Sequence, residues 1–431
     1  MKAFPILKIL ASVLVLLTTT IVYAQQTGTQ EPMQHAGTSA TPLAGLIEEA
    51  TANNPRILAS VHAYKASTHK PKQEGALPDT QLMVQHLSVG SPRPFSGYTN
   101  SDFAYIGLGA SQEFPYPGKR KLRAEVAARE ADSLKEQSES AGREVIGRLK
   151  AAYFQLAFVQ QAISLLQHHD GVLANMEQIV ESQYRVGKGD QQEVLRAQLQ
   201  HTRILQEIAM NKREEGRLEA QLKQLLGRSQ DSPDIVAEPL RERPLPYTSS
   251  QLSQMVREQN PAIRSQQAML RQAQSQVALT HKEFRPDFNF QYMYQNTDRK
   301  FRDYYMLTFG MNLPNRGRRR AELAESLEKQ ERAAREVDAE IQGRSAELQE
   351  QLSVAQTSSE QLKIYNEGLI PQAAATFRSA LAAYQANRQG FQTLLSSFLD
   401  VLDLDLQYQR NLADHESALA QIEALTGVTL P

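Results

Sequence analysis

A pair of histidines and a group of aspartates are the side chains in this sequence whose spacing suggests chemistry. His168 and His169 are adjacent, and adjacent side chains on a helix point about 100° apart, so the pair cannot share a metal ion. We expect both to be surface histidines. Asp400 and Asp403 lie three positions apart, which puts both carboxylates on one face of a helix. That face either lines a pore or, as we favour, is the solvated outer side of the helix.

Sequence motifs of catalysis are absent from the chain. There is no glycine-rich phosphate loop, no Cys/His zinc spacing and no Gly-x-Ser-x-Gly turn. The chain has no cysteine, which excludes disulfides, thiolate metal sites and a lipid-modified cysteine. A net charge of −1 with 22% charged residues does not fit a nucleic-acid partner. The sequence therefore predicts neither an enzyme nor a site for a cofactor or a metal.

The first segment, residues 1–24, predicts a secretory signal peptide. Lys2 and Lys8 precede an apolar run over residues 9–22, and small residues then lead to cleavage after Ala24. An N-terminal membrane anchor is the alternative, but the apolar run is shorter than the roughly 20 residues that a spanning helix needs. Residues 25–42 are polar and rich in Gly, Thr and Gln, which predicts a flexible leader without a packed core.

Most of the remaining chain consists of two copies of one unit. The copies keep nearly the same length from Gly118 and Gly317 onward. We predict a first structural repeat over residues 43–230, a linker over 231–247 and a second repeat over 248–431. The recurring landmarks, in chain order, are Asn54-Pro55-Arg56-Ile57 with Asn260-Pro261-Ala262-Ile263, Pro78-Asp79 with Pro286-Asp287, "PYPGKRK" with "PNRGRRR", "YRVGKGDQQEVL" with "YQANRQGFQTLL", and "QLLGRS" with "ALTGVT".

Each repeat is predicted to contain one long helix. The first would run without a proline from Gly118 to Tyr184, about 100 Å at 1.5 Å per residue. Gly368 and Pro371 predict a kink or local break in the second. Apolar residues of the first helix alternate by three and four, which predicts a heptad seam packed against another helix. These residues are Leu149, Ala152, Leu156, Val159, Ile163 and Leu166.

Short segments at about 80–89, 103–113, 287–295 and 303–313 are predicted to be strands. In "PDFNFQYMYQN" the aromatic residues alternate with Asn, Gln and Met, and a period of two with one aromatic face is typical of a transmembrane barrel. The edge of a soluble sandwich is the alternative. The smallest outer-membrane barrels use about eight strands, so four strands cannot close a barrel in one chain. The barrel must therefore be shared between chains.

Together these features resemble the TolC family of outer-membrane efflux ducts, over about Leu43 to Gly427. The resemblance is strongest in "NEGLIPQAAATFRSALAAYQANRQGFQTLLSSFLDVLDLDLQYQ" (366–409) and "YRVGKGDQQEVLRAQ" (184–198). It implies a mainly α fold with a transmembrane β-barrel, in which a homotrimer shares twelve strands and the long helices form a periplasmic tunnel. "GLIPQA" and "GKRKLRAE" are most similar to the branch that serves tripartite cation-efflux pumps of the RND type.

The resemblance also implies that the far ends of the long helices are helix-turn-helix tips where a periplasmic adaptor docks. Gly187 and Gly189 allow close backbone approach and positive φ. Asn387 replaces the first of these glycines, so we expect the second tip to dock less closely or to use a different turn. A plain helical hairpin, which needs such residues in any case, is the alternative. The tip residues are Tyr184, Val186, Gly187, Lys188 and Gly189 in the first repeat, and Tyr384, Ala386, Asn387, Arg388 and Gly390 in the second.

The implied function is that of a passive exit duct in the outer membrane, reaching into the periplasm. Its partners would be two further copies of the chain, a periplasmic adaptor, an inner-membrane pump and outer-membrane lipid, and its cargo metal cations or small toxic compounds. If Asp400 and Asp403 face the lumen, threefold symmetry would turn them into an acidic ring, which favours cations. Family gates carry acidic residues just before the second tip, and "AATFRSALAAY" has none.

A soluble periplasmic coiled-coil scaffold or adaptor is the alternative function. Its strand pairs would then form a small soluble domain. Adaptors, however, carry one helical hairpin inserted in a lipoyl-like unit, and the presence of two copies here argues against that class.

Overall fold

The computed structural model describes residues 40–88, 104–297 and 303–430. The predicted signal peptide and most of the predicted leader lie outside the described residues. The described elements are α1 (Leu43–Asn53), α2 (Pro55–Ser67), α3 (Lys70–Glu74), β1 (Gln81–Leu87), β2 (Tyr105–Phe114), α4 (Lys119–Arg185), α5 (Gln191–Leu226), α6 (Ser249–Gln259), α7 (Pro261–Lys282), β3 (Asp287–Asn296), β4 (Asp303–Asn312), α8 (Arg316–Ile364), the π-helix η1 (Tyr365–Leu369), α9 (Ile370–Gln385) and α10 (Phe391–Thr426).

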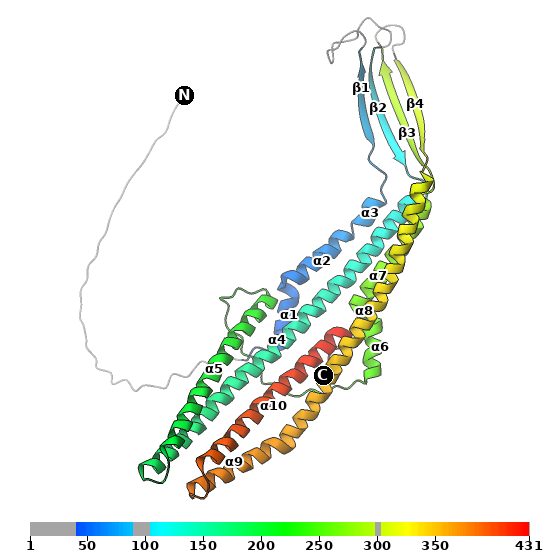
Figure 1. The fold of residues 1–431 in the computed structure, drawn as a ribbon. Helices are drawn as coiled ribbons and strands as arrows, with labels where there is room; N and C mark the ends of the chain where they lie inside the picture. The colour runs from blue at the N-terminus through cyan, green and yellow to red at the C-terminus, as the bar shows by residue number, and fades with distance from the viewer. Residues whose placement is uncertain (1–39, 89–103, 298–302, 431) are drawn as a thin grey trace, which may run out of the picture. The chain divides into compact units, whose positions relative to one another are not determined.

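The element order repeats as the sequence landmarks predict. Short helices lead to a strand pair, then to a long helix, a turn and a return helix of 36 residues, α5 in the first repeat and α10 in the second. Figure 1 shows the strands at one end of the helices and the α4–α5 and α9–α10 turns at the other. Each strand pair is therefore separated from its turn by the full length of a long helix.

Matching asparagines explain why the Asn-Pro landmark recurs. Asn54 caps α2 and Asn260 caps α7, each through its side-chain oxygen and two backbone N–H groups. The Asn54 side-chain amide also donates to Leu225 O at 2.7 Å, and that of Asn260 to Leu425 O at 2.9 Å. In both repeats one side chain thus joins the start of one helix to the end of another.

The long helix and its seam are confirmed. α4 runs for 67 residues without interruption, and the six predicted seam residues are all buried. The first five pack against α1, α5 and the extended segment that contains Ile235, whereas Leu166 belongs to the next cluster along α4. Farther along α4, Leu173, Met176 and Val180 pack against α5, α9 and α10. The predicted break in the second long helix is also confirmed, as the π-helix η1 ahead of Pro371.

The strands form one antiparallel sheet in the order β1-β2-β3-β4. Their registers obey the repeat: Gln81 lies opposite Ser111 in the first pair, and Asn289 lies opposite Gly310 in the second. β1 therefore corresponds to β3 and β2 to β4, residue by residue. In the part of the chain that the structure describes, β1 and β4 are the sheet edges and pair on one side only.

The two faces of the sheet differ in their side chains. One face carries exposed apolar side chains from every strand, among them Leu82, Val84, Leu108, Phe290, Tyr292, Tyr305, Leu307 and Phe309. The opposite face is richer in small and polar residues, with Gln85, Gly107, Gly109, Ser111, Asn289, Gln291, Gln295 and Thr308, and it also carries Met83, Met293, Tyr304 and Met306. Aromatic rings of neighbouring strands stack on the apolar face, Phe288 on Phe309 at 5.8 Å and Tyr292 on Tyr305 at 6.4 Å.

Within the described ranges, no helix is both long enough and apolar enough to span a membrane.

Candidate functional site: the helix turns and the sheet faces

The first tip is a tight turn between α4 and α5. Gly187 N donates to Tyr184 O at 3.0 Å, and Lys188 N donates to Gln183 O at 2.9 Å. These bonds satisfy the last carbonyls of α4, and they require the left-handed conformation of Gly187, whose φ is +73°. The predicted positive φ is thus confirmed at Gly187.

Gly189 serves the same turn in a different way. It is not among the residues with positive φ, so the prediction of positive φ is wrong there. A Cβ on Gly189 would lie 3.3 Å from both Gln183 Cβ and Tyr184 N. This glycine is needed for close packing of the chain against the end of α4.

The second tip has the same turn as the first. Asn387 N donates to Tyr384 O and Arg388 N to Ala383 O, both at 2.9 Å. Asn387 has φ +55° and is the one non-glycine residue with positive φ among those described. Asparagine is the residue after glycine that best tolerates this region. Of the two alternatives expected for this tip, a different turn is wrong, because the asparagine reproduces the glycine conformation. Less close docking stays a prediction.

The tips differ in what they expose. In the first, Tyr184 and Val186 are 47% and 66% exposed, and Gly187 and Lys188 are also at the surface. In the second, Ala386, Asn387, Arg388 and Gly390 are exposed, whereas Tyr384 is 5% exposed and packs on Phe391 with ring centroids 5.8 Å apart. Tyr384, predicted from the sequence as a docking residue, lies inside the tip.

Glu193 connects the two tips and was not identified from the sequence. Its carboxylate accepts from Tyr384 Oη at 3.1 Å and from Phe391 N at 3.3 Å. Burial, and then the bond to Glu193, raises the pKa of Tyr384, so this phenol stays a donor. Glu193 stands three residues after Asp190, which is the spacing of a helix capping pair. That spacing indicates a local role for Glu193 and not a partner in the second repeat.

Asp400 and Asp403 both lie exposed on α10. Asp403 accepts a hydrogen bond from Gln407 on the next turn of the helix. Asp405 points elsewhere and lies 3.0 Å from His169 Nε2. His169 is 6% exposed and packs edge-on against Phe398, so the expectation of a surface histidine is wrong for His169, while His168 is exposed.

Metal binding finds no support among the residues that are described. No group of three or more His, Cys, Asp or Glu side chains there is placed to hold a metal ion.

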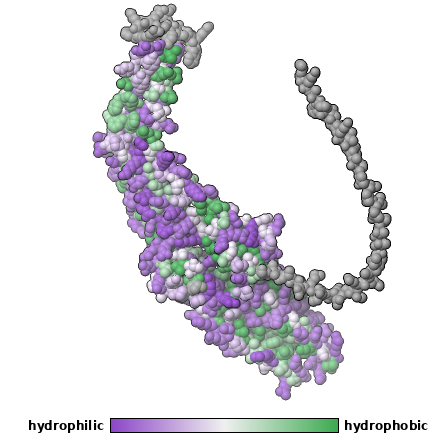
Figure 2. Space-filling view, turned by 180° about the vertical axis from the view of Figure 1, so that it is seen from behind, coloured by the Kyte–Doolittle hydropathy of each residue, from purple (hydrophilic) through white to green (hydrophobic). Residues whose placement is uncertain are grey.

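The apolar face of the sheet is the second feature with functional meaning. Figure 2 shows green, hydrophobic side chains gathered over the strands, whereas purple side chains dominate the surface of the helices. Leu82 is 82% exposed, Val84 72% and Phe309 70%. Exposed apolar residues facing outward, with glycine and amide side chains behind them, are the pattern of a barrel strand between lipid and an aqueous lumen.

The fold is shared with solved structures of outer-membrane channel proteins. The outer membrane protein VceC of Vibrio cholerae is 17% identical, with 89% of this chain and 96% of that chain covered at a TM-score of 0.76. The Campylobacter jejuni CmeC outer membrane channel is 14% identical, with 89% and 85% covered at 0.77. CusC is 14% identical, with 91% and 93% covered, also at 0.77.

Sequence comparison identifies the family. A family model described as "Outer membrane efflux protein" matches residues 46–228 and 252–425. No curated protein gives a sequence match to the chain. The chain belongs to the outer membrane efflux protein family, and its function is that of an exit duct in the outer membrane.

Proposed function

We propose that three copies of the chain form one duct, in which the strands close a shared twelve-stranded barrel and the long helices form a tunnel across the periplasm. The two-faced sheet carries this proposal. Its apolar face fits lipid and its polar face fits water. Lipid leaves no unpaired backbone group without a large cost, so the open edges of β1 and β4 require partner strands. Two further copies supply them.

The helix turns are proposed to receive a periplasmic adaptor. The exposed surface of the first tip, with Tyr184, Val186, Gly187 and Lys188, supports this. Its apolar and basic side chains stand next to bare glycine backbone, which permits close approach of a partner helix. An inner-membrane pump would load the cargo and supply the conformational work, while this chain provides a sealed passive path.

The proposed cargo is a metal cation or a small toxic compound. The exposed carboxylates of Asp400 and Asp403 support the first, because threefold repetition would turn them into an acidic ring that favours cations if they face the lumen. The sequence similarity to the cation-efflux branch points the same way. A soluble scaffold is disfavoured, since it would leave the apolar sheet face in contact with water.

The decisive experiment is fractionation combined with resistance profiling. We expect the mature chain in the outer-membrane fraction as a heat-sensitive trimer, and a deletion strain that becomes sensitive to metal salts, to organic toxicants, or to both. A soluble monomer recovered from periplasmic extract would contradict the duct. Replacing Asp400 and Asp403 by Asn should lower metal resistance more than resistance to uncharged compounds. Equal losses of resistance to the two kinds of compound would contradict a role for these carboxylates in cation export.

A further inference from the structure

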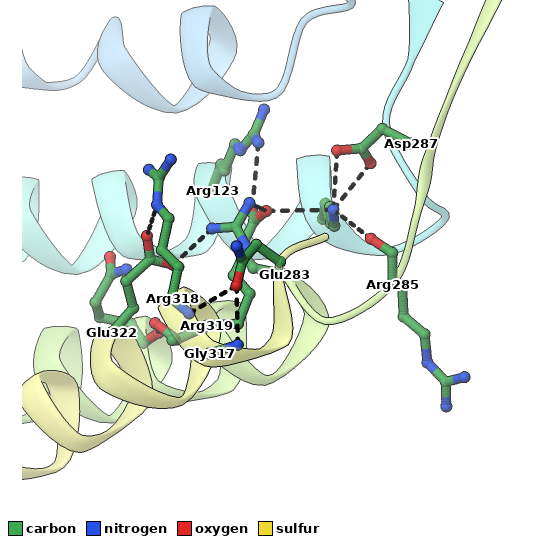
Figure 3. Close-up of polar contacts among 12 residues, drawn as sticks. Arg123, Glu283, Arg285, Asp287, Gly317, Arg318, Arg319 and Glu322 are labelled. Atoms are coloured by element: carbon green, nitrogen blue, oxygen red, sulfur yellow. Dashed lines mark hydrogen bonds and ion pairs between the residues drawn. The ribbon is translucent and has the colours of Figure 1, made fainter. Parts of the chain in front are cut away.

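A buried lysine lies where strands β2 and β3 meet the start of helix α4. Lys119, the first residue of α4, is 1% exposed. Its Nζ donates to both carboxylate oxygens of Asp287 at 2.9 Å and to Arg285 O at 2.9 Å, and it lies 3.2 Å from Glu283. Tyr116 N also donates to Asp287 at 2.7 Å. We name this group the β2–β3 junction; Figure 3 labels its members Glu283, Arg285 and Asp287.

The β2–β3 junction lies where the two repeats meet within one chain. Lys119 and Tyr116 follow β2, and Asp287 opens β3, the strand paired with β2. A buried ammonium group is stable only when it is paired and hydrogen-bonded. The carboxylate of Asp287 therefore connects the start of β3, in the second repeat, to the start of α4, in the first.

The repeat places equivalent positions a second time next to the two open edges of the sheet. Arg318 occupies in "PNRGRRR" the place of Lys119 in "PYPGKRK", and Asn315 the place of Tyr116. Asp79 corresponds to Asp287 through the matching Pro-Asp landmark. The identical registers of β1–β2 and β3–β4 confirm this alignment.

These counterparts do not meet each other within the chain. Arg318 is 74% exposed and pairs with Glu322 on its own helix, at 2.7 Å. Asp79 is exposed, and in the described part of the chain it has no ion-pair or hydrogen-bond partner. Each therefore lacks the partner that its equivalent has at the β2–β3 junction.

The charges nearby change in a compensating way. Gly75 stands where the second repeat has Glu283, and Glu322 stands where the first has Arg123. Lys119 has two carboxylates, from Glu283 and Asp287. Arg318 has one, from Glu322, and the position of its second corresponds to Asp79. A carboxylate at the position of Asp79 in a neighbouring copy would give Arg318 a second partner, as Asp287 does for Lys119.

We infer that Asp79 of one copy accepts from Arg318 of the next copy in the trimer, reproducing the β2–β3 junction between chains. The inference rests on the proposed trimer and adds to it the residues and the register. The β2–β3 pairing places Ala110 opposite Tyr292 and Gly109 opposite Met293. Carried over by the repeat, it places Phe309 opposite Val84 and Thr308 opposite Gln85 of the next copy.

This register keeps the two faces of the sheet continuous across the boundary between copies. Phe309 and Val84 are both exposed and both on the apolar face, and Thr308 and Gln85 are both on the polar face. A slip by one residue would exchange the faces. A slip by two would keep them, but it would move Arg318 away from Asp79, so the ion pair selects the register.

Cysteine crosslinking tests the register without background, because the chain has no cysteine. Residues directly opposite in antiparallel strands are roughly 4.5 to 5.5 Å apart at Cα, within disulfide range. The Thr308→Cys/Gln85→Cys variant should form covalent dimers and trimers under mild oxidation. The matched Thr308→Cys/Leu87→Cys variant, shifted by two residues, should form far fewer. Crosslinking that favours the shifted pair would overturn the register while leaving the trimer intact; a monomer with no crosslink in either pair would overturn both.

Charge exchange tests the ion pair. Asp79→Arg and Arg318→Asp should each abolish most of the trimer at a temperature that wild-type trimer survives, and the double exchange should restore at least half of it. Arg320→Asp, the same charge change two residues away, is the control and should leave the trimer unchanged. Single exchanges that match Arg320→Asp, or a double exchange no better than the singles, would overturn the pairing even when crosslinking confirms the register.

Discussion

Bulky substitutions at equivalent positions of the two tips should separate backbone strain from adaptor docking. Gly187 and Asn387 occupy the same point of the same turn, with φ of +73° and +55°. Phenylalanine at either position must adopt the left-handed region, at a cost of about 1 to 2 kcal/mol. Because Asn387 already bears part of this cost and glycine bears none, the added strain is somewhat larger in Gly187→Phe. Gly187→Asn measures that part, and a loss beyond it reports a contact made outside the chain.

Neither substitution should prevent folding. A Cβ on Gly187 would meet no atom within 4 Å, and Asn387 already carries an exposed side chain. The cost is small beside the total stability of a folded protein, about 5 to 15 kcal/mol. Trimer levels in the outer membrane should therefore be close to wild type for both variants.

Export should respond differently at the two tips. We expect Gly187→Phe to abolish resistance in a complemented deletion strain, because the ring would stand where an adaptor helix meets bare backbone, and Asn387→Phe to reduce it less. Gly187→Asn, which copies the residue of the second tip, should keep the turn and more of the activity. Adaptor crosslinking is recorded in parallel. Equal losses in the two Phe variants would refute docking as the cause, and full resistance with normal crosslinking in Gly187→Phe would remove the docking role altogether.

Further expectations concern the tip contact, pH and helix capping. Glu193→Ala leaves the buried Tyr384 hydroxyl without its acceptor, and it should raise the conductance of the purified trimer in planar bilayers; an unchanged closed-state conductance would show that this bond does not hold the tips together. Burial, followed by nearby carboxylates, raises the pKa of Glu219 from 4.5 to about 7. The folded state then binds more protons than the unfolded state between these values, so stability should fall as pH rises through that window. Glu219→Gln should raise the melting temperature at pH 8 and leave it unchanged at pH 4, and a gain of the same size at both would exclude this origin. Asn260→Ala removes a helix cap and the bond to Leu425 O, and it should lower the free energy of unfolding by about 2 kcal/mol; an unchanged denaturation midpoint would contradict the capping role.

Local and periodic information was sufficient to predict much of the fold. The three-and-four spacing of Leu149 to Leu166 depends only on helix geometry, and the structure buries every member. The same spacing continued one step beyond Leu166 reaches His169, followed by Leu173, Met176 and Val180, all of them buried. The pattern therefore contained the burial of His169. The position of His169 in the seam, rather than the polarity of its side chain, determines its burial.

Contacts between the repeats were beyond prediction from one sequence. Nothing near Glu193 indicates that its carboxylate reaches Tyr384 and Phe391, which lie in the other repeat. The turn at Asn387 is a different case, since the tolerance of asparagine for positive φ is a local property. The absence of glycine at this position does not exclude the turn, because the residue that replaces it is asparagine.

The two tips have the same backbone conformation, but the tyrosine of the second is buried and that of the first is exposed. This difference suits the second tip to holding the chain closed and the first to binding a partner. Tyr384 is buried against Phe391 and bonded to Glu193 of the first repeat, so movement of the second tip must break a contact inside the chain. Tyr184, its counterpart, is 47% exposed and next to Val186 at 66%, so the first tip can gain a partner without losing one. Because Glu193 opens α5, the helix that follows the first tip, an adaptor pressing on that tip would act directly on the residue that holds the second. Under the proposed docking, binding at the first tip and movement of the second would be linked through this carboxylate and through the apolar cluster that α4 and α5 share with α9 and α10.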